Sequence, residues 1–149
     1  MVNLSKSKYC ALWQCPKMLW LRKYKPELAE VDSHTLSIME TGNAVGDLAM
    51  GLFGDFTEVT VYTDGEIDLS AMVRRTQEEI KKDTSVICEA SFEWNGLYCA
   101  VDILRREGDG WSIYEVKSST SDDKAVYIAD VAYQKFVLEH CGVKVTGTY

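Results

Sequence analysis

The sequence predicts a single α/β domain in which helices flank a central mixed β-sheet. Three strand-like runs follow one another at 86–94, 97–105 and 111–117, and helical patterns at 69–82 and 124–141 lie on both sides of them. The 149 residues are 46% hydrophobic and 26% charged, which suits one domain with a real core and excludes a disordered or fibrous chain.

The residues before the central runs are predicted to be largely helical. Ser5 can cap a helix whose apolar residues recur at helical spacing, and Pro16 should kink that helix or start a second one. Residues 35–53 form another helical pattern, in which Gly42 and Gly46 leave a smooth stripe where a neighbour can pack closely.

Two further strands are predicted outside the three central runs. The alternating residues 57–63 predict a strand, and residues 143–149 predict a last one. Because the chain stops inside that strand, we expect residues 1–149 to be one domain of a longer protein, truncated at its C-terminus.

The helix at 69–82 should bury the residues that share one of its faces: Met72, Val73, Thr76 and Ile80.

Two turns fix which residues of the central strands face each other. Asn95-Gly96 is the strongest short hairpin signal, and a turn centred there pairs Glu89 with Asp102. A second turn within Glu107–Gly110 pairs Asp102 with Glu115. The three acids should therefore form a row on one face of the sheet. The opposite face should hold the neighbouring apolar residues: Ala90, Phe92, Val101, Ile103, Tyr114 and Val116.

A row of carboxylates needs a compensating cation. Like charges directly opposite one another cost roughly 0.2–1 kcal/mol on a solvated sheet, and Mg²⁺ is typically held by one or two carboxylates. Lys117 lies two residues past Glu115 and points the same way. A metal beside an ammonium group is suited to an anionic substrate such as a phosphodiester. The alternative is a surface salt bridge between Asp102 and Lys117, with Glu89 merely exposed.

The charge of the chain is unevenly spread. The net formal charge is −7, but residues 1–26 contain basic side chains and no acid. Such asymmetry is typical of a segment that meets a polyanion, and it also fits a solvated helix face. Trp13 and Trp20 lie beside these basic residues and could stack on unpaired bases, although tryptophans at helical spacing also pack in cores.

The sequence shows no sign of secretion or membrane insertion. It contains no apolar run long enough to span a bilayer and no charged-then-apolar leader, so we expect a cytoplasmic protein. Its five cysteines include no CxxC pair, which argues against a disulfide framework and a closed zinc site.

These residues resemble the PD-(D/E)XK nuclease superfamily, in particular its RecB-like exonucleases and CRISPR-adaptation nucleases. The core motif of that superfamily matches Asp102 and the triplet Glu115-Val116-Lys117. The opening serine-rich helix with Cys-Pro matches "LSKSKYCALWQCPKMLWL", and the helix glutamine matches Gln134 in "DVAYQKFVL". The resemblance covers nearly the whole chain and implies a restriction-endonuclease-like core with added N-terminal helices.

The resemblance implies a Mg²⁺- or Mn²⁺-dependent deoxyribonuclease, with exonuclease action expected. Asp102, Glu115 and the main-chain carbonyl of Val116 would hold the metal. Lys117 would be the catalytic lysine, and Gln134, with Asp130 one turn before it, would face the site. The basic segment would contact DNA through Lys17, Arg22 and Lys23.

Three positions depart from the RecB-like pattern. Gly46 stands where these enzymes have a metal-binding histidine, and Glu89 is the candidate to supply the missing charge. Leu138 replaces a tyrosine that usually follows the glutamine. Cys15 matches only one of the cysteines that bind an iron–sulfur cluster in related enzymes, so we expect no cluster in these residues.

The implied partners are DNA and a helicase or another repair or recombination subunit, with no membrane. Two other functions stay open. The chain could be a catalytically inactive DNA-binding module that keeps the nuclease fold, or a partner-binding domain that takes neither metal nor DNA. A nuclease would cleave DNA, an inactive module would bind DNA without cleaving it, and a partner-binding domain would do neither.

Overall fold

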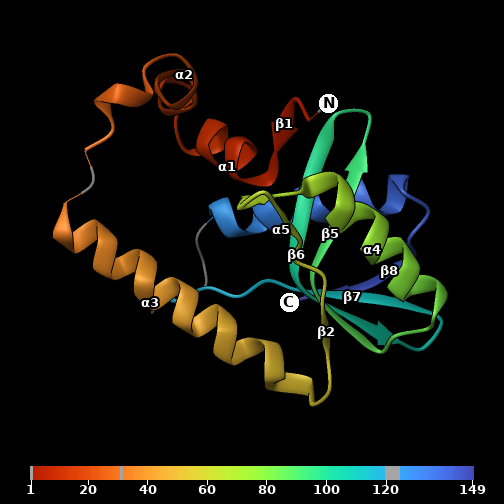
Figure 1. Ribbon diagram of the computed structural model, residues 1–149. Helices are drawn as coiled ribbons and strands as arrows, with labels where there is room; N and C mark the ends of the chain where they lie inside the picture. Colours follow the sequence, from red (N-terminus) through yellow and green to blue (C-terminus); the bar gives the residue numbers. More distant parts are fainter. Residues whose placement is uncertain (1, 31, 120–124) are drawn as a thin grey trace.

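The computed structural model describes residues 2–30, 32–119 and 125–149, and a mixed β-sheet lies at its centre (Figure 1). Within these ranges the sheet has the strand order β2-β5-β6-β7-β8, and β1 also pairs with β6. The middle strands are antiparallel, whereas β1, β2 and β8 pair in parallel with their neighbours. The strands are β1 (Leu4–Ser5), β2 (Thr57–Glu58), β5 (Val86–Trp94), β6 (Leu97–Glu107), β7 (Gly110–Tyr114) and β8 (Val145–Thr148).

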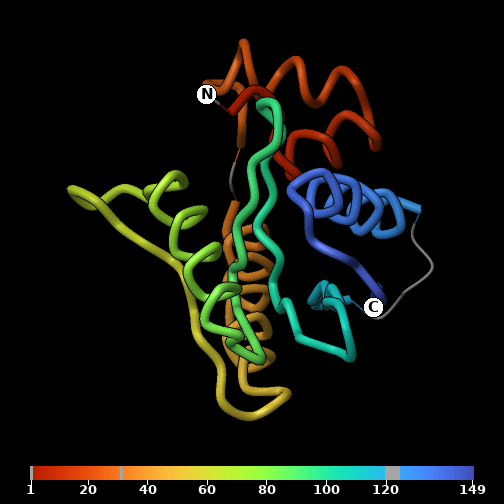
Figure 2. Tube along the Cα trace, turned by 90° about the vertical axis from the view of Figure 1, so that its right-hand side faces the viewer, coloured from red at the N-terminus to blue at the C-terminus, as the bar shows by residue number. Residues whose placement is uncertain are grey.

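Helices flank this sheet, as the sequence predicts. Figure 2 shows α4 and α5 on opposite sides of β5 and β6, with α1 and α2 together at one end of the molecule. The helix α3 runs past the sheet on its own and is joined to it through η2 (Figure 1). The helices are α1 (Lys6–Gln14), α2 (Pro16–Tyr24), η1 (Pro26–Leu28), α3 (Ser33–Met50), η2 (Gly51–Phe53), α4 (Leu69–Lys81) and α5 (Ala125–His140).

Local signals set the helix boundaries. The hydroxyl of Ser5 accepts the backbone N–H of Lys8, and Pro16 occupies the first turn of α2, so the predicted break into two helices is confirmed. The helix α4 begins after Asp68, whose carboxylate caps it by accepting the N–H of Ala71 at 2.8 Å.

The prediction of one strand at 57–63 is wrong. Only Thr57–Glu58 joins the main sheet, while β3 (Tyr62–Thr63) pairs with β4 (Glu66–Ile67) in a separate two-stranded hairpin. The reason is the turn at Asp64-Gly65, where both residues have positive φ and reverse the chain direction.

The predicted inward face of α4 is confirmed in part. Met72 and Thr76 are buried, whereas Val73 and Ile80 are half-buried. Glu79 is also buried, although its charge argued against this position, because Lys82 and Thr84 each donate to its carboxylate at 2.7 Å.

The predicted register of the first hairpin is confirmed. Asn95 and Gly96 have φ of +49° and +82°, as a type I′ turn requires. The ladder on either side of Glu89 contains the pairs Cys88↔Ile103 and Ala90↔Val101. Glu89 therefore stands opposite Asp102.

The second hairpin also has the predicted register. Its outermost pairs are Ile103↔Tyr114 and Glu107↔Gly110. Glu115 follows directly after β7 and stands opposite Asp102, one step beyond the end of this ladder. Its backbone N–H is bonded instead to the carbonyl of Tyr149, at 2.9 Å, next to β8.

The predicted apolar face of these strands is wrong in one respect. Ala90, Phe92 and Val101 pack in the main core, but Ile103 packs in a second cluster with Val86 and Cys88, beside Tyr114 and Val116. The strict alternation stops at Glu89, whose φ of +56° interrupts the ladder. Glu89 and Asp102 lie at this interruption, between the two apolar clusters and beside a cleft.

Candidate functional site

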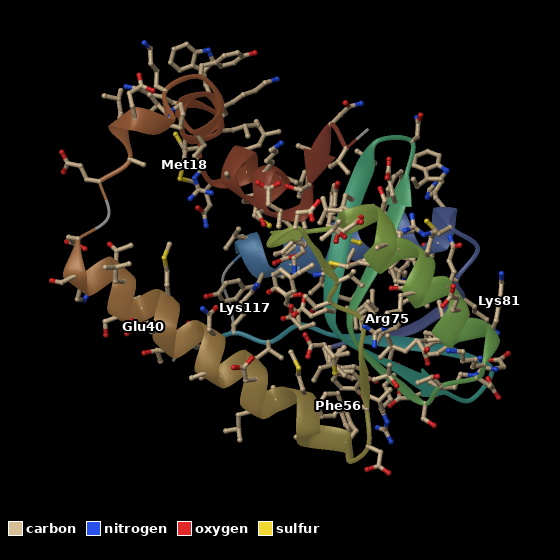
Figure 3. All side chains as sticks on the ribbon, viewed as in Figure 1. Met18, Glu40, Phe56, Arg75, Lys81 and Lys117 are labelled. Atoms are coloured by element: carbon tan, nitrogen blue, oxygen red, sulfur yellow. The ribbon has the colours of Figure 1, made fainter. Side chains whose placement is uncertain are left out.

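An acidic cleft of about 350 Å³ lies between α3 and the sheet. The predicted residues Glu89, Asp102, Glu115 and Lys117 all line it, and Figure 3 shows Lys117 beside the middle of α3. The structure therefore brings the predicted row of acids and its lysine together. The α3 side of the cleft is formed by Gly42, Asn43, Gly46, Asp47 and Met50.

Lys117 is held by carboxylates from two elements. Its ammonium group donates to Glu115 and, at 3.0 Å, to Asp130 of α5. The expected alternative, a salt bridge between Asp102 and Lys117, is not the arrangement found among the described contacts.

Gln134 connects the same two acids from inside the core. Its amide nitrogen donates to Glu115 at 2.7 Å and to Asp130 at 2.8 Å, and its side chain is fully buried. Its amide oxygen is the buried side-chain atom that has no hydrogen-bond partner within the described residues. Asp130 contacts Lys117, whereas Gln134 donates to Glu115 and Asp130 and not to the lysine among the described contacts.

Asp102 is oriented by the next strand. Its Oδ2 accepts the backbone N–H of Val116 at 2.7 Å. The carbonyl of Val116 is the expected ligand, whereas the contact that the structure shows is made by its backbone N–H. This bond fixes the Asp102 carboxylate at the cleft, and its other oxygen, Oδ1, lies 3.7 Å from Lys6 Nζ.

Lys6 is the residue of this site that was not expected from the sequence. Its Nζ lies 3.0 and 3.1 Å from the two oxygens of Glu115, 3.7 Å from Asp102 Oδ1 and 3.9 Å from Asp130 Oδ1. It comes from the first residue of α1, 109 positions before Glu115. The available signal was Ser5, whose cap fixes the start of the helix, but nothing local places that helix at the cleft.

Burial and neighbouring charges shift the pKa values of these groups. Burial, reinforced by Asp102, raises the pKa of Glu89 to about 7. Burial likewise raises the pKa of Glu115. Burial lowers the pKa of Lys6, but the carboxylates around it outweigh this effect and raise its pKa overall. The pKa of Asp130 is raised by burial and lowered more strongly by Lys6 and Lys117, so it ends below its ordinary value.

Within residues 2–30, 32–119 and 125–149, no three His, Cys, Asp or Glu side chains are set out as a ready-made metal site. The carboxylates converge instead on ammonium groups. Because Asp102, Glu115 and Asp130 all lie within 4 Å of the Lys6 nitrogen, the donor set nevertheless surrounds a cation. Oxygen donors of this kind fit Mg²⁺ or Mn²⁺ if the ammonium group leaves.

A second cavity of about 540 Å³ adjoins the acidic cleft and shares Glu115 and Lys117 with it. Its other walls come from α5 and the end of β8 and include Tyr127, Ile128 and Tyr149. Apolar and aromatic surface therefore lies directly beside the candidate catalytic lysine.

The predicted DNA-contacting residues lie outside the cleft. Lys17, Arg22 and Lys23 are exposed on α2, and Trp13 and Trp20 are about half exposed nearby. This basic and aromatic surface belongs to the end of the molecule formed by α1 and α2 (Figure 1). Cys15, the one position matching an iron–sulfur ligand, is an exposed free thiol.

Comparison with known proteins identifies no relative. No family model matches the chain, and neither a curated protein nor a solved structure matches it. In the described part of the chain, no helix has both the length and the apolar character needed to cross a membrane.

Proposed function

We propose that this chain is a metal-dependent deoxyribonuclease with a restriction-endonuclease-like core of the PD-(D/E)XK type. The observation that carries the proposal is that Asp102, Glu115 and Lys117 line one acidic cleft. Behind it, Asp130 and the buried Gln134, both on α5, bind the lysine and Glu115. A purely structural salt bridge would not require a fully buried glutamine that binds two acids at once.

Asp102 and Glu115 are the residues that would hold Mg²⁺ or Mn²⁺. Glu89 and the carbonyl of Val116 would be additional ligands. Such a cation supplies neutralisation of the phosphoryl oxygens and acidifies a water molecule. Gln134 keeps Glu115 oriented by its 2.7 Å bond. The hydrogen bond from Val116 does the same for Asp102.

Lys117 is suited to act on the reacting phosphate. Its ammonium group lies at the boundary between the acidic cleft and the second cavity. Held by Glu115 and Asp130, it stays charged, since these neighbours outweigh burial and raise its pKa. A fixed positive charge there would position the attacking water and stabilise the charge that develops on the phosphoryl oxygens.

DNA is the proposed substrate, and the exposed basic side chains of α2 are the proposed backbone contacts. A helicase or another repair or recombination subunit is the proposed partner. Because the chain as a whole carries a net charge of −7, attraction to a polyanion has to come from local positive charge. Lys17, Arg22 and Lys23 supply it on one exposed helix.

A catalytically inactive DNA-binding module is the second candidate. It is favoured by Gly46, which lines the cleft where RecB-like enzymes carry a histidine ligand. It is also favoured by Lys6, whose ammonium group already neutralises part of the acidic cluster. In that case DNA would bind without being cut.

Cleavage of end-labelled DNA by wild type, Lys117→Met and Lys81→Met tests the proposal. Lys81 lies on α4 and serves as the matched control, since it is exposed and lies far from Lys117 in Figure 3. With Mn²⁺, Lys117→Met should cut roughly 10²–10⁴-fold more slowly than wild type, while Lys81→Met should cut normally. With Ca²⁺ in place of Mn²⁺, all three should bind DNA with similar affinity.

The outcomes separate the candidates. Equal cleavage by wild type and Lys117→Met would refute the catalytic role of the lysine. Binding without cleavage by the wild type would favour the inactive module. Binding of neither DNA nor metal would leave the partner-binding domain.

A further inference from the structure

The ammonium group of Lys6 occupies the centre of the acidic cluster. It contacts both oxygens of Glu115 at 3.0 and 3.1 Å, and it lies within 4 Å of Asp102 and Asp130. Its side chain is only 17% exposed, so it is a nearly buried counter-ion rather than a surface charge. Lys117 contacts Glu115 and Asp130 but is not within ion-pair distance of Asp102 in the described contacts.

The backbone that carries Lys6 is fixed on the sheet. Leu4 and Ser5 pair with Leu97 and Tyr98 as strand β1. The hydroxyl of Tyr133 donates to the carbonyl of Leu4 at 2.8 Å, and Ser5 caps α1. Only the flexible four-carbon stem of Lys6 can therefore move without undocking the chain, and any movement keeps the ammonium group near the cleft.

A divalent cation and the Lys6 ammonium group require the same oxygens. A metal held by Asp102 and Glu115 has to approach Glu115 oxygens that now lie about 3 Å from Lys6 Nζ. Metal–oxygen distances for Mg²⁺ are roughly 2.0–2.1 Å, so both cations cannot share these oxygens at their present positions without strong repulsion. The two cations therefore compete for one site.

We propose that Lys6 is a built-in counter-ion that has to leave the carboxylate cluster before a divalent cation binds there, and that a substrate phosphate receives its ammonium group when it leaves. This inference rests on the proposed nuclease function, because it requires a metal and a phosphate in the same cleft. Lys6 would then lower the affinity of the cluster for a divalent cation and couple it to substrate binding.

The consequence is a thermodynamic coupling between metal and DNA. A phosphate that attracts Lys6 frees Glu115 for the metal, and a metal that displaces Lys6 frees an ammonium group for the phosphate. Each ligand should therefore strengthen binding of the other by the same factor. In the absence of DNA, the lysine should keep metal affinity low.

The experiment compares wild type, Lys6→Met and Lys8→Met. Lys8 is the matched control because it lies on the same helix turn but is exposed. Calorimetric titration with Ca²⁺ and thermal melting without metal are measured for each. Lys6→Met should bind Ca²⁺ at least about fivefold more tightly than wild type, the lower end of common coupling factors. It should also melt at a lower temperature without metal, because the carboxylates lose their counter-ion.

The coupling is measured by repeating the Ca²⁺ titration with a short single-stranded oligonucleotide present. In wild type and Lys8→Met, the oligonucleotide should tighten Ca²⁺ binding several-fold. In Lys6→Met this gain should largely disappear. Lys6→Gln provides a second variant that keeps a hydrogen-bond donor, in case the methionine variant does not fold, and it should behave in the same direction.

The failure of this inference is distinct from the failure of the proposed function. If wild type cuts DNA with Mn²⁺ while Lys6→Met and Lys6→Gln bind Ca²⁺ with wild-type affinity, the counter-ion role is refuted and the nuclease stands. If Lys6→Met binds Ca²⁺ and wild type does not, the competition is supported in its extreme form. If no variant binds a divalent cation, both proposals fall.

Discussion

The backbone N–H of Val116 donates to Oδ2 of Asp102 at 2.7 Å, which ties β6 to the segment that follows β7. The regular ladder between these strands ends at Ile103↔Tyr114, so this side-chain bond continues the connection beyond it. The carboxylate of Asp102 thus has both a structural and a proposed metal-binding role, and substitutions can separate the two.

Asp102→Asn should remove the metal response and leave the fold intact. Asparagine keeps an oxygen that can accept from Val116, so the free energy of unfolding without metal should change by less than about 1 kcal/mol. Asp102→Ala leaves the backbone N–H of Val116 without an acceptor and should lower the free energy of unfolding by about 1–3 kcal/mol. Urea unfolding with and without Mn²⁺ measures both effects. A full Mn²⁺ response in Asp102→Asn would locate the metal elsewhere.

Glu89 should make the metal-free protein less stable as the pH rises. Its pKa is raised from 4.5 to about 7, so between these values the folded state binds more protons than the unfolded state, and stability falls as pH increases. Glu89→Gln removes this penalty. The free energy of unfolding of Glu89→Gln minus that of wild type should therefore be larger at pH 8 than at pH 5.

The control for this titration is Glu78→Gln, at an exposed acid on α4. This variant reports the effect of removing one exposed carboxylate. If Glu89→Gln differs from wild type by the same amount at both pH values, burial does not raise the pKa of Glu89 as stated, and the acid is solvated.

Gly46→His should strengthen transition-metal binding. Gly46 lines the acidic cleft, and a Cβ added there would meet nothing within 4 Å. The new imidazole would add a nitrogen ligand to the carboxylate oxygens of Asp102 and Glu115, so a bound Mn²⁺ would gain one more protein ligand. Mn²⁺ affinity should rise by at least about tenfold, the effect that even outer-shell ligand partners have. Ala44→His, at an exposed position of α3 outside the cleft, should leave the affinity unchanged.

Neutralising Lys17, Arg22 and Lys23 together should weaken DNA binding and flatten its dependence on salt. Each lost phosphate contact lowers the slope of log affinity against log salt by roughly 0.7–0.9. Fluorescence anisotropy at several NaCl concentrations, with Ca²⁺ present, measures the slope. The pair Arg74→Gln and Lys81→Gln on α4 is the control and should keep the wild-type slope. An unchanged slope in the triple variant would place the DNA on another surface.

The central hairpins could be predicted from sequence because their signals are local. The Asn95-Gly96 turn determines the pairing of β5 with β6, and this pairing brings Glu89 opposite Asp102. The expectation that Gln134 faces the site followed from the resemblance rather than from any pattern in the helix. In the structure Gln134 donates to Glu115 at 2.7 Å, a partner that neither the pattern nor the resemblance named.

The features that were missed depend on longer-range or unusual backbone geometry. A positive φ at a glutamate is uncommon, so nothing in the sequence indicated that alternation would stop at Glu89. The position of Lys6 depends on the parallel pairing of the two-residue strand β1 with β6, which is too short to give a periodic signal. Nonlocal contacts of this kind cannot be read from spacing.

That short strand has a consequence for the order of folding. Lys6 is synthesised 109 residues before Glu115, and Leu4 is synthesised 129 residues before Tyr133, which holds its carbonyl. The acidic cluster therefore receives its internal ammonium group only when almost the whole chain is present, which is typical of a late folding step. Reversing that step, by fraying of β1 from β6, would expose bare carboxylates without unfolding the core. Fraying of β1 would therefore make the cleft more negative, because Lys6 follows directly after this strand.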